Sequence, residues 1–454
     1  MRKLALSIAL LFLSTTTLLA QIDYEQQRTF KSELKQQIKQ ELTEELGLEQ
    51  PNSSKIRLKP YGFVRNYITY DSRECVAVMG EMFNIIPKDE LLNEDRSEDL
   101  NDVDKLSFVS FTTRLGVDVA GPNLGRAKSS AKIEADFSGY GANNTLFRIR
   151  QAYLSLSWDR TTLICGQTWH PMTNQVMPAV YGFGTSSPFM PFNRAPQIKV
   201  LVDAGKGWNF TAAALYQFPN LSTGPEGVSV SYSRWSMLPE LYASWAHAGD
   251  HLTYGVGVDL LSIMPRKTSL AEREVLQEDG SMQTQTVQVR AKDRVMGISP
   301  EFFADYINGK FNIKGKVVYA ENTAHMTMVS GFGATSYDPQ TGSYQYAPLR
   351  SISTWMTATY GDKLKPGLML GYAKNLGAKS DFMSLDEIWV RHARNTDYIY
   401  RISPSLSYTI KNLQLALEVD YTVVGYGDLL LNGSVNALRD INNTRACLMI
   451  KYSF

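Results

Sequence analysis

The sequence lacks any long apolar run after its first twenty residues, although hydrophobic residues make up 44% of the chain. A helix that crosses a bilayer needs about 20 consecutive apolar residues. We therefore predict no transmembrane helix beyond residue 20.

Cysteine is scarce, and charge of either sign is not in excess. The three cysteines, Cys75, Cys165 and Cys447, are scattered and odd in number, so they predict neither a disulfide framework nor a metal cluster. The formal net charge is +1, which gives no indication of a polyanionic partner such as nucleic acid.

Catalytic signatures are missing as well. The chain has five histidines and contains neither a Gly-x-Ser-x-Gly elbow nor a phosphate-binding loop. His247 and His251 flank a predicted turn, so they are not a metal-binding pair on one helix. His170 lies where a predicted strand leaves for a long loop and has no evident serine or acidic partner. We predict no catalytic residues, no metal ligands and no cofactor, although enzymes built on related architectures have to be weighed.

The N-terminus has the three parts of a secretory signal peptide. Arg2 and Lys3 supply positive charge, residues 4–13 are apolar, and Ala20 is the small residue before the expected cleavage point. The apolar run is too short for a comfortable membrane anchor. No cysteine follows it, which argues against lipoprotein anchoring. We predict that residues 1–20 are removed.

Residues 21–50 differ from the rest of the chain. Phe30, Leu34, Ile38, Leu42 and Leu46 recur every four residues, which predicts a short periplasmic helix with an apolar stripe. The stripe drifts around the helix, so a strict heptad seam is absent. Self-association as a coiled coil and service as a solvated spacer both remain open. Residues 51–55 form a linker.

From residue 56 to residue 454 the hydrophobic period is two. Leu415, Leu417 and Val419 share one face of a strand, and Glu418 and Asp420 share the other. The segments are about 9–14 residues long, which suits strands that cross a bilayer better than the five or six residues usual in soluble sheets. Alternating lipid-facing and lumen-facing residues are typical of outer-membrane barrels.

The sequence contains sixteen such segments. The connections between them are alternately short turns and long loops, as in bacterial outer-membrane barrels. We predict an all-β fold, a transmembrane antiparallel β-barrel of about 16 strands, with both chain ends in the periplasm and no buried apolar core in its lumen. The predicted long loops are 71–105, 170–195, 265–293, 321–349 and 375–396.

The last strand carries an independent signal. Leu448, Ile450, Tyr452 and Phe454 alternate on one face, and the sequence given stops at the aromatic residue. This resembles the terminal strand by which the barrel-assembly machinery recognises outer-membrane proteins. We therefore predict the cell outer membrane as the location, with lipid and lipopolysaccharide as surroundings.

Two stretches resemble known porins. Residues 113–118, 131–135 and 150–156, followed by 163–168, are similar to the "RLG … ARQAY … GxxxxGRQ" strand pattern of Gram-negative general porins. Residues 166–171 and 191–198 look closer to the DcaP-like porins. That resemblance implies a homotrimer, an N-terminal helical extension and uptake of small dicarboxylates. Gln167 and Thr168 replace the Gly-Arg-Gln often found in general porins.

The candidate constriction combines loop 170–195, rich in proline and aromatic residues, with a basic wall. Period-two alternation in the strands, together with one residue at the end of loop 170–195, predicts the pore-lining set. Its members are Arg114, Lys132, Arg148, Arg150, Gln167, Arg194, Gln197 and Lys199.

The direction of Arg148 and Arg150 is open, because Leu154, Leu156 and Trp158 share their parity. A bulge or a protein contact surface would explain the conflict.

Fixed positive charge in a narrow pore attracts anions. The alternative is that Asp118, Glu134 and Asp136 simply balance these cations. We expect a porin for passive diffusion of small hydrophilic solutes that prefers anions such as dicarboxylates. An outer-membrane adhesin, receptor or cell-wall tether is the alternative.

Overall fold

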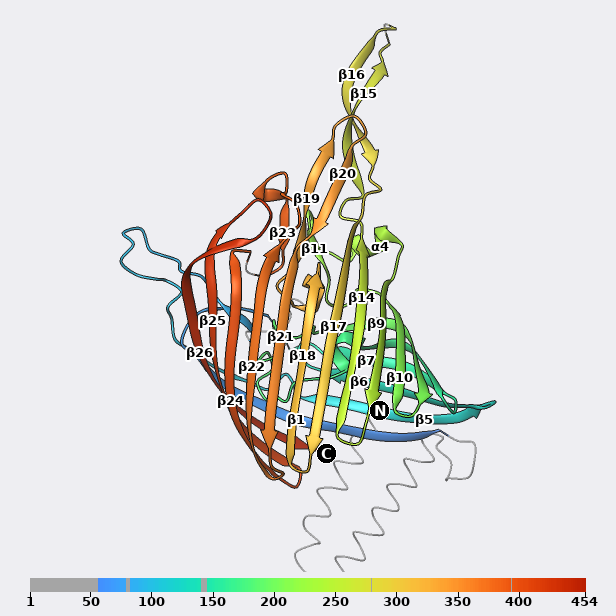
Figure 1. The fold of residues 1–454 in the computed structure, drawn as a ribbon, viewed down its shortest axis with the longest axis vertical. Coiled ribbons are helices and arrows are strands. Elements are labelled where there is room, and N and C mark those ends of the chain that lie inside the picture. Colours follow the sequence, from blue (N-terminus) through green and yellow to red (C-terminus); the bar gives the residue numbers. More distant parts are fainter. Residues whose placement is uncertain (1–55, 79–81, 140–144, 279, 393) are drawn as a thin grey trace, which may run out of the picture.

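The strands of this chain close into a ring in the computed structural model (Figure 1). The structure describes residues 56–78, 82–139, 145–278, 280–392 and 394–454. The expected signal peptide (1–20), helix (21–50) and linker (51–55) lie outside these residues.

The main sheet contains 17 strands, each antiparallel to its neighbours. β4 and β5 both pair with β1, one after the other, so they form one interrupted strand and the barrel has sixteen positions. Pairing of β1 with β26 closes the ring. The barrel strands are β1 (Arg57–Asp71), β4 (Lys105–Val109), β5 (Arg114–Leu124), β6 (Ala127–Asp136), β7 (Arg148–Ser157), β8 (Thr161–Trp169), β9 (Arg194–Gly205), β10 (Trp208–Leu215), β13 (Glu240–Ala248), β14 (Leu252–Ile263), β17 (Val295–Asn308), β18 (Phe311–Glu321), β21 (Arg350–Tyr360), β22 (Leu364–Gly377), β24 (Thr396–Ile410), β25 (Leu413–Leu429) and β26 (Val435–Ser453).

Period-two alternation decides which way each side chain points. On β25, Leu417 is 51% exposed on the outer face, whereas the adjacent Glu418 is 1% exposed on the lumenal side. An apolar outer face and a polar inner face are the arrangement that a bilayer requires of a barrel. The predicted fold class, a transmembrane antiparallel barrel of sixteen strands, is confirmed.

One end of the barrel carries short turns, and we call it the turn end. Gly205, Lys206 and Gly207 all adopt positive φ there, at 86°, 53° and 80°, which makes the reversal between β9 and β10 tight. Trp208 beside this turn stacks against Trp245 at a centroid distance of 5.8 Å. Aromatic pairs of this kind occur at membrane–water interfaces.

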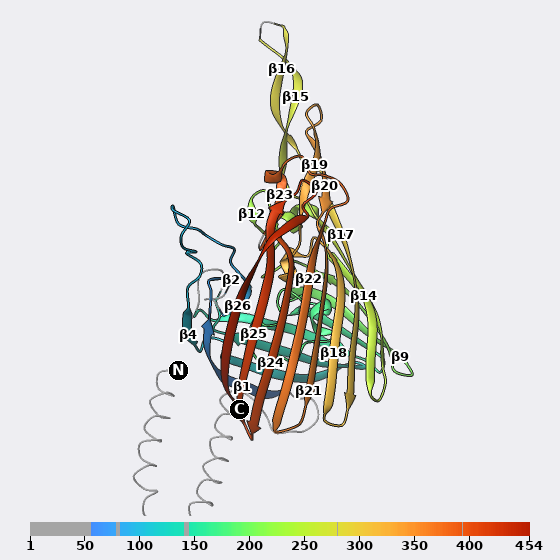
Figure 2. The ribbon, with the colours of Figure 1, turned by 60° about the vertical axis from the view of Figure 1, so that its left-hand side comes forward.

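The opposite end, which we call the loop end, extends well beyond the barrel (Figures 1 and 2). The predicted loops 265–293, 321–349 and 375–396 contain strands of their own, and the hairpin β15–β16 reaches farthest. The additional strands are β2 (Cys75–Val78) with β3 (Phe83–Pro87), β11 (Thr223–Gly224) with β12 (Gly227–Val228), β15 (Thr268–Leu276) with β16 (Met282–Arg290), and β20 (Ser343–Pro348) with β19 (Gly331–Asp338) and β23 (Ile388–Val390).

Helical structure in the described residues is limited to segments of three to six residues. It comprises α3 (Pro171–Asn174), α4 (Ser231–Ser236), η2 (Ala324–Met326) and η3 (Leu385–Glu387). Among the residues that the structure describes, no helix has the length and apolar character needed to cross a lipid bilayer.

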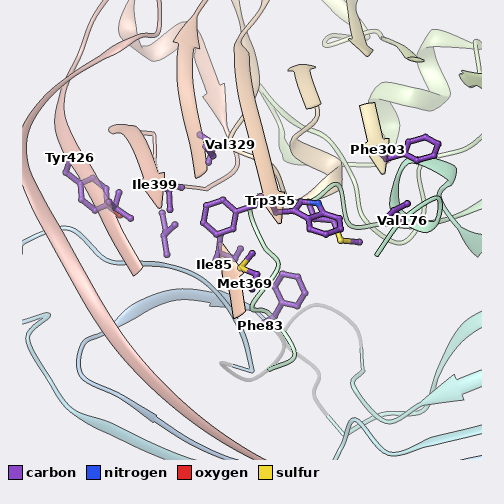
Figure 3. Packing of buried hydrophobic residues seen from close by; sticks show 14 of the residues in the cluster. Phe83, Ile85, Val176, Phe303, Val329, Trp355, Met369, Ile399 and Tyr426 are labelled. Atoms are coloured by element: carbon purple, nitrogen blue, oxygen red, sulfur yellow. The ribbon is translucent and has the colours of Figure 1, made fainter. Parts of the chain in front are cut away.

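A buried apolar cluster fills part of the barrel interior (Figure 3). Phe83 from β3 and Phe189 from loop 170–195 join Trp355 on the inward face of β21, and each is at most 1% exposed. The expectation of a lumen without a buried apolar core was therefore wrong. The prediction placed loop 170–195 at the constriction but considered only the polar inner face of the strands, whereas two loops fold inward and bury their own apolar side chains there.

Candidate pore and constriction

Loop 170–195 folds into the barrel and crosses it. The Glu418 carboxylate on β25 accepts hydrogen bonds from the backbone N–H groups of Tyr181 and Gly182, at 2.8 and 2.7 Å. On β21, the Ser353 hydroxyl donates to the Phe189 carbonyl at 2.8 Å. These bonds attach the loop to strands far from its origin at β8, so it narrows the interior as a constriction loop would.

Tyr181 marks the point where the loop meets the wall between β24 and β1. Its hydroxyl lies 2.7 Å from the Ser407 hydroxyl, and its carbonyl accepts a hydrogen bond from Tyr67 at 2.9 Å. Burial, together with the Glu418 carboxylate, raises the pKa of the Tyr181 phenol, so this side chain stays neutral.

Loop 71–105 also enters the interior through the β2–β3 hairpin, which sequence reasoning missed. Arg401 on β24 joins the two loops. Its guanidinium donates to the carbonyls of Thr185 and Ser187 at 2.6 and 2.8 Å, and to the carbonyl of Ile85 at 3.0 Å. A cavity of about 10 Å³ lies here, lined by residues of both loops and of the barrel wall. The two loops therefore pack closely against this wall, and β7 to β9 lie on the opposite wall.

That opposite wall is basic, and a bulge sets its orientation. The pairing of β6 with β7 shifts so that Glu134 faces Gln151 and Ala135 faces Ile149, which leaves Arg150 as the extra residue. Arg148 and Arg150 consequently point inward with Glu134 and Asp136, while Ile149 is 57% exposed on the outer face. A bulge was one of the two explanations considered in the sequence analysis. It explains how these two arginines point inward although they share the parity of outward-facing residues later in β7.

Four of the predicted cations have carboxylate partners. Arg114 and Arg150 lie 3.4 and 3.0 Å from Glu134. Arg148 lies 2.7 Å from Asp136, and Lys132 lies 2.8 Å from Asp118. The balancing carboxylates anticipated from the sequence are therefore present, and these four cations alone leave little net charge.

Arg194 and Lys199 are different. Both are 6% exposed, and within the described parts of the chain neither forms an ion pair with a carboxylate. The Arg194 guanidinium stacks 4.5 Å from the ring of Trp169, and its Nε and Nη1 atoms have no hydrogen-bond partner among the described residues. These two groups are positive charge that the wall itself does not neutralise.

Sequence reasoning missed two further inward cations. Arg65 on β1 and Lys451 on β26 lie 4.9 and 5.1 Å from the ring centre of Phe63, which Arg114 also approaches at 4.9 Å. In the part of the chain that the structure describes, neither Arg65 nor Lys451 has a carboxylate partner. Alternation would have found them, because Arg65 and Lys451 occupy the inward parity of their strands.

The two predicted glutamines do not act alike. Cross-strand pairing places Gln167 on the same face as Cys165 and the 57% exposed Ile198, so its side chain does not point into the lumen. Its amide donates to the carbonyls of Ile149 and Arg150, at the bulge. The pore-lining assignment of Gln167 was therefore wrong, because the inward row of β8 runs through the next residue.

Gln197 does point inward and is buried. Its amide donates to the carbonyls of Thr168, Trp169 and Ala195 at 3.1–3.2 Å, so it supports the backbone beside Arg194.

Two cavities open at the turn end of the interior. One of about 380 Å³ lies beneath Tyr181 and is lined by Lys310, Lys314 and Lys365. The other, of about 400 Å³, is lined by Lys411 and Lys451. Lys310 is paired with Asp362 at 2.7 Å and Lys314 with Asp305 at 3.4 Å, so these two lysines add little net positive charge at this mouth.

One group of potential metal ligands lies at the loop-end side of the interior. His170, Glu240 and Asp259 are buried, and their ligand atoms lie within 4.8 Å of one another. No acidic partner of His170 was evident from the sequence, because its partners lie on strands that begin seventy and more positions later.

No family profile and no curated protein sequence matches this chain. Among solved structures, the chain is similar to the outer membrane channel DcaP of Acinetobacter baumannii, at 19% identity and TM-score 0.62, with 89% of this chain and 100% of the other covered.

It is also similar to an anion-selective porin from Comamonas acidovorans (11% identity, TM-score 0.53, 88% and 100% covered). A third similar structure is a trimer form of OmpT, an outer membrane protein of Vibrio cholerae (12% identity, TM-score 0.50, 89% and 100% covered). The chain shares its barrel fold with these outer-membrane channels and porins, as the resemblance in its sequence indicated.

Proposed function

We propose that the chain is an outer-membrane porin, without enzymatic activity, through which small hydrophilic solutes diffuse passively with a preference for anions such as dicarboxylates. The barrel fold, the apolar outer face and the inward loop support the porin function. The loop end would face outward from the cell and the turn end the periplasm.

The observation that carries the anion preference is the set of inward cations without carboxylate partners. Four such cations lie on one side of the interior: Arg65, Arg194, Lys199 and Lys451. The ion pairs beside them carry no net negative charge that would neutralise these four. Across the lumen, the Glu418 carboxylate is held by backbone N–H groups of the constriction loop and forms no ion pair with these four cations in the described residues. A solute passing between loop and wall would meet uncompensated positive charge.

Dicarboxylates suit such a wall for a chemical reason. A guanidinium presents parallel N–H donors that match a carboxylate, and Arg65 and Arg194 both retain donor capacity. Arg65 lies over the Phe183 ring of loop 170–195, with 5.8 Å to the centroid, so the basic wall and the loop meet at this arginine.

A homotrimer is part of the proposal. The similar OmpT structure is a trimer form, and the sequence of this chain resembles trimeric porins. The segment 21–50 would assist assembly or contact the cell wall.

A second candidate is an adhesin or receptor. The β15–β16 and β19–β20 hairpins project far beyond the barrel (Figure 1). Arg266, just before β15, lies 4.1 Å from the ring centre of Tyr344 in β20, so the two hairpins contact each other. Such a projection suits contact with a partner. A barrel without these hairpins that conducts normally but loses surface binding would favour this second function.

Liposome swelling tests the porin proposal. Purified protein would be reconstituted and challenged with a short dicarboxylate, its neutral diamide and a diamine of equal length. We expect the rates to fall in that order, because size is matched and charge differs. No swelling with any solute would refute the porin, and fastest entry of the diamine would refute the anion preference.

A further inference from the structure

The group around His170 is built from four elements that are distant in sequence. His170 ends the strand region of β8 and caps α3, Glu240 begins β13, Asp259 lies on β14, and His325 lies in η2. All four side chains are at most 3% exposed. None of them belongs to the basic wall, and the inference below does not depend on the proposed transport function.

The distances between the ligand atoms suit a metal ion. The Glu240 Oε1 atom lies 3.1 Å from His170 Nε2 and 2.9 Å from His325 Nε2, and Asp259 Oδ1 lies 3.6 Å from His170 Nε2. Around a tetrahedral zinc ion with bonds of about 2.0–2.2 Å, neighbouring ligand atoms lie about 3.3–3.6 Å apart. Small side-chain adjustments would therefore seat an ion between these groups.

The charges at this position also call for a cation. In the described residues, no lysine or arginine forms an ion pair with Glu240 or Asp259. A further buried acidic residue, Glu301, already has a cation partner, because it is paired with Lys316 at 2.8 Å. Buried charges are stable only when they are paired or coordinate a metal. A divalent ion would neutralise both carboxylates at once.

Asp259 is the separate observation that points to a ligand. It is 1% exposed, and neither of its carboxylate oxygens has a hydrogen-bond partner among the described residues. It faces the imidazole of His170 and not solvent. Buried polar atoms without partners are rare and mark positions where a further group completes the bonding.

We infer that His170, Glu240 and Asp259 bind a divalent transition-metal ion of the zinc type, with His325 holding the Glu240 carboxylate. Imidazole and carboxylate ligands together suit Zn²⁺. The ion would join the stem of loop 170–195 to β13 and β14 and would brace η2 against them, so it would fix the constriction loop in the barrel.

Binding would change one existing contact. His170 Nδ1 accepts a hydrogen bond from the Met172 backbone N–H at 3.2 Å, so in the neutral ring the proton sits on Nε2. A metal on Nε2 would move that proton to Nδ1 and cost this long N–H···N bond. The metal–imidazole bond would replace it.

Metal binding to the full-length folded protein tests the inference. Protein in detergent would be stripped with a chelator and titrated with Zn²⁺, and separately with Co²⁺, whose visible spectrum reports coordination geometry. We expect one ion per chain and the intense spectrum of a four- or five-coordinate site. His325→Gln should weaken affinity about 10- to 100-fold, the effect typical of residues that orient metal ligands. Asp259→Asn should abolish stoichiometric binding.

His251→Gln is the matched control, because His251 is an exposed histidine at a turn and lies outside the group. It should bind the metal as the wild type does. Heat-modifiable mobility would verify that each variant is folded. Absence of stoichiometric binding by the folded wild type overturns the inference, whatever the variants do. Equal binding by wild type and folded Asp259→Asn also overturns it, since the ion would then be adventitious.

Discussion

Arg401→Gln should release the constriction loop. The Arg401 guanidinium is 3% exposed and donates to the carbonyls of Gly184, Thr185, Ser187 and Ile85 and to the hydroxyl of Thr422. It is therefore a joint between two inserted loops and the wall of the barrel.

The magnitude follows from these bonds. A hydrogen bond from a charged donor contributes about 1.5–3 kcal/mol, and a buried carbonyl left without a partner costs about 1–3 kcal/mol. Glutamine can replace only part of the set. We expect the inserted arrangement to lose about 3 kcal/mol, which raises the population of the released loop roughly a hundredfold, since about 1.4 kcal/mol corresponds to a factor of ten.

Single-channel recording and limited proteolysis would measure this effect. The variant should show larger and noisier currents than the wild type and faster cleavage within residues 170–195. Lys379→Gln is the control, because it removes one positive charge from an exposed side chain that lines none of the described cavities. Unchanged current and protease resistance in Arg401→Gln would refute the reasoning.

Three further predictions concern other parts of the chain. Phe454→Asp should lower barrel assembly, because it places a charge at the end of the alternating apolar row of the last strand, where the Phe454 side chain is 60% exposed; unchanged heat-modifiable mobility would count against this. The double variant Arg148→Ala/Arg150→Ala leaves the fully buried Asp136 carboxylate unpaired, so it should lower stability by about 3 kcal/mol or more and reduce anion selectivity; an unaltered melting temperature and reversal potential would contradict both expectations. A chain beginning at residue 51 should form fewer trimers or bind cell-wall sacculi less, and identical behaviour to the full chain would leave the helix as a spacer.

The barrel itself could be predicted from the sequence because its signal is local. Each strand alternates in polarity along its own length, as Leu417 and Glu418 do, and no distant contact is needed to detect that pattern. The region of period two was predicted to begin at residue 56, and the first barrel strand, β1, begins at Arg57.

The inserted loops and the ligand group could not be predicted because their partners are distant. Phe83 and Phe189 lie in loops without periodicity, so nothing local indicates that they pack on Trp355 inside the barrel. Likewise, His170 finds Glu240 only once β8 and β13 are assembled.

Period-two counting gave the wrong side-chain direction beside the β-bulge in β7. A single extra residue at Arg150 shifts the register of β7, and Gln167 on the neighbouring strand caps the carbonyls that the bulge exposes. Period-two counting cannot anticipate such an insertion, because a bulge changes the direction of every side chain on one side of it.

The central claim is that uncompensated cations on one wall make this barrel an anion-preferring channel. The direct test is the reversal potential of single channels in a KCl gradient, for the wild type and for Arg65→Gln/Lys451→Gln. For the wild type we predict a reversal potential whose sign shows that chloride is more permeant than potassium. For the double variant we predict a shift of the reversal potential toward zero, because both substituted side chains face the lumen beside Phe63. Cation selectivity in the wild type, or an unshifted potential in the variant, would contradict the account.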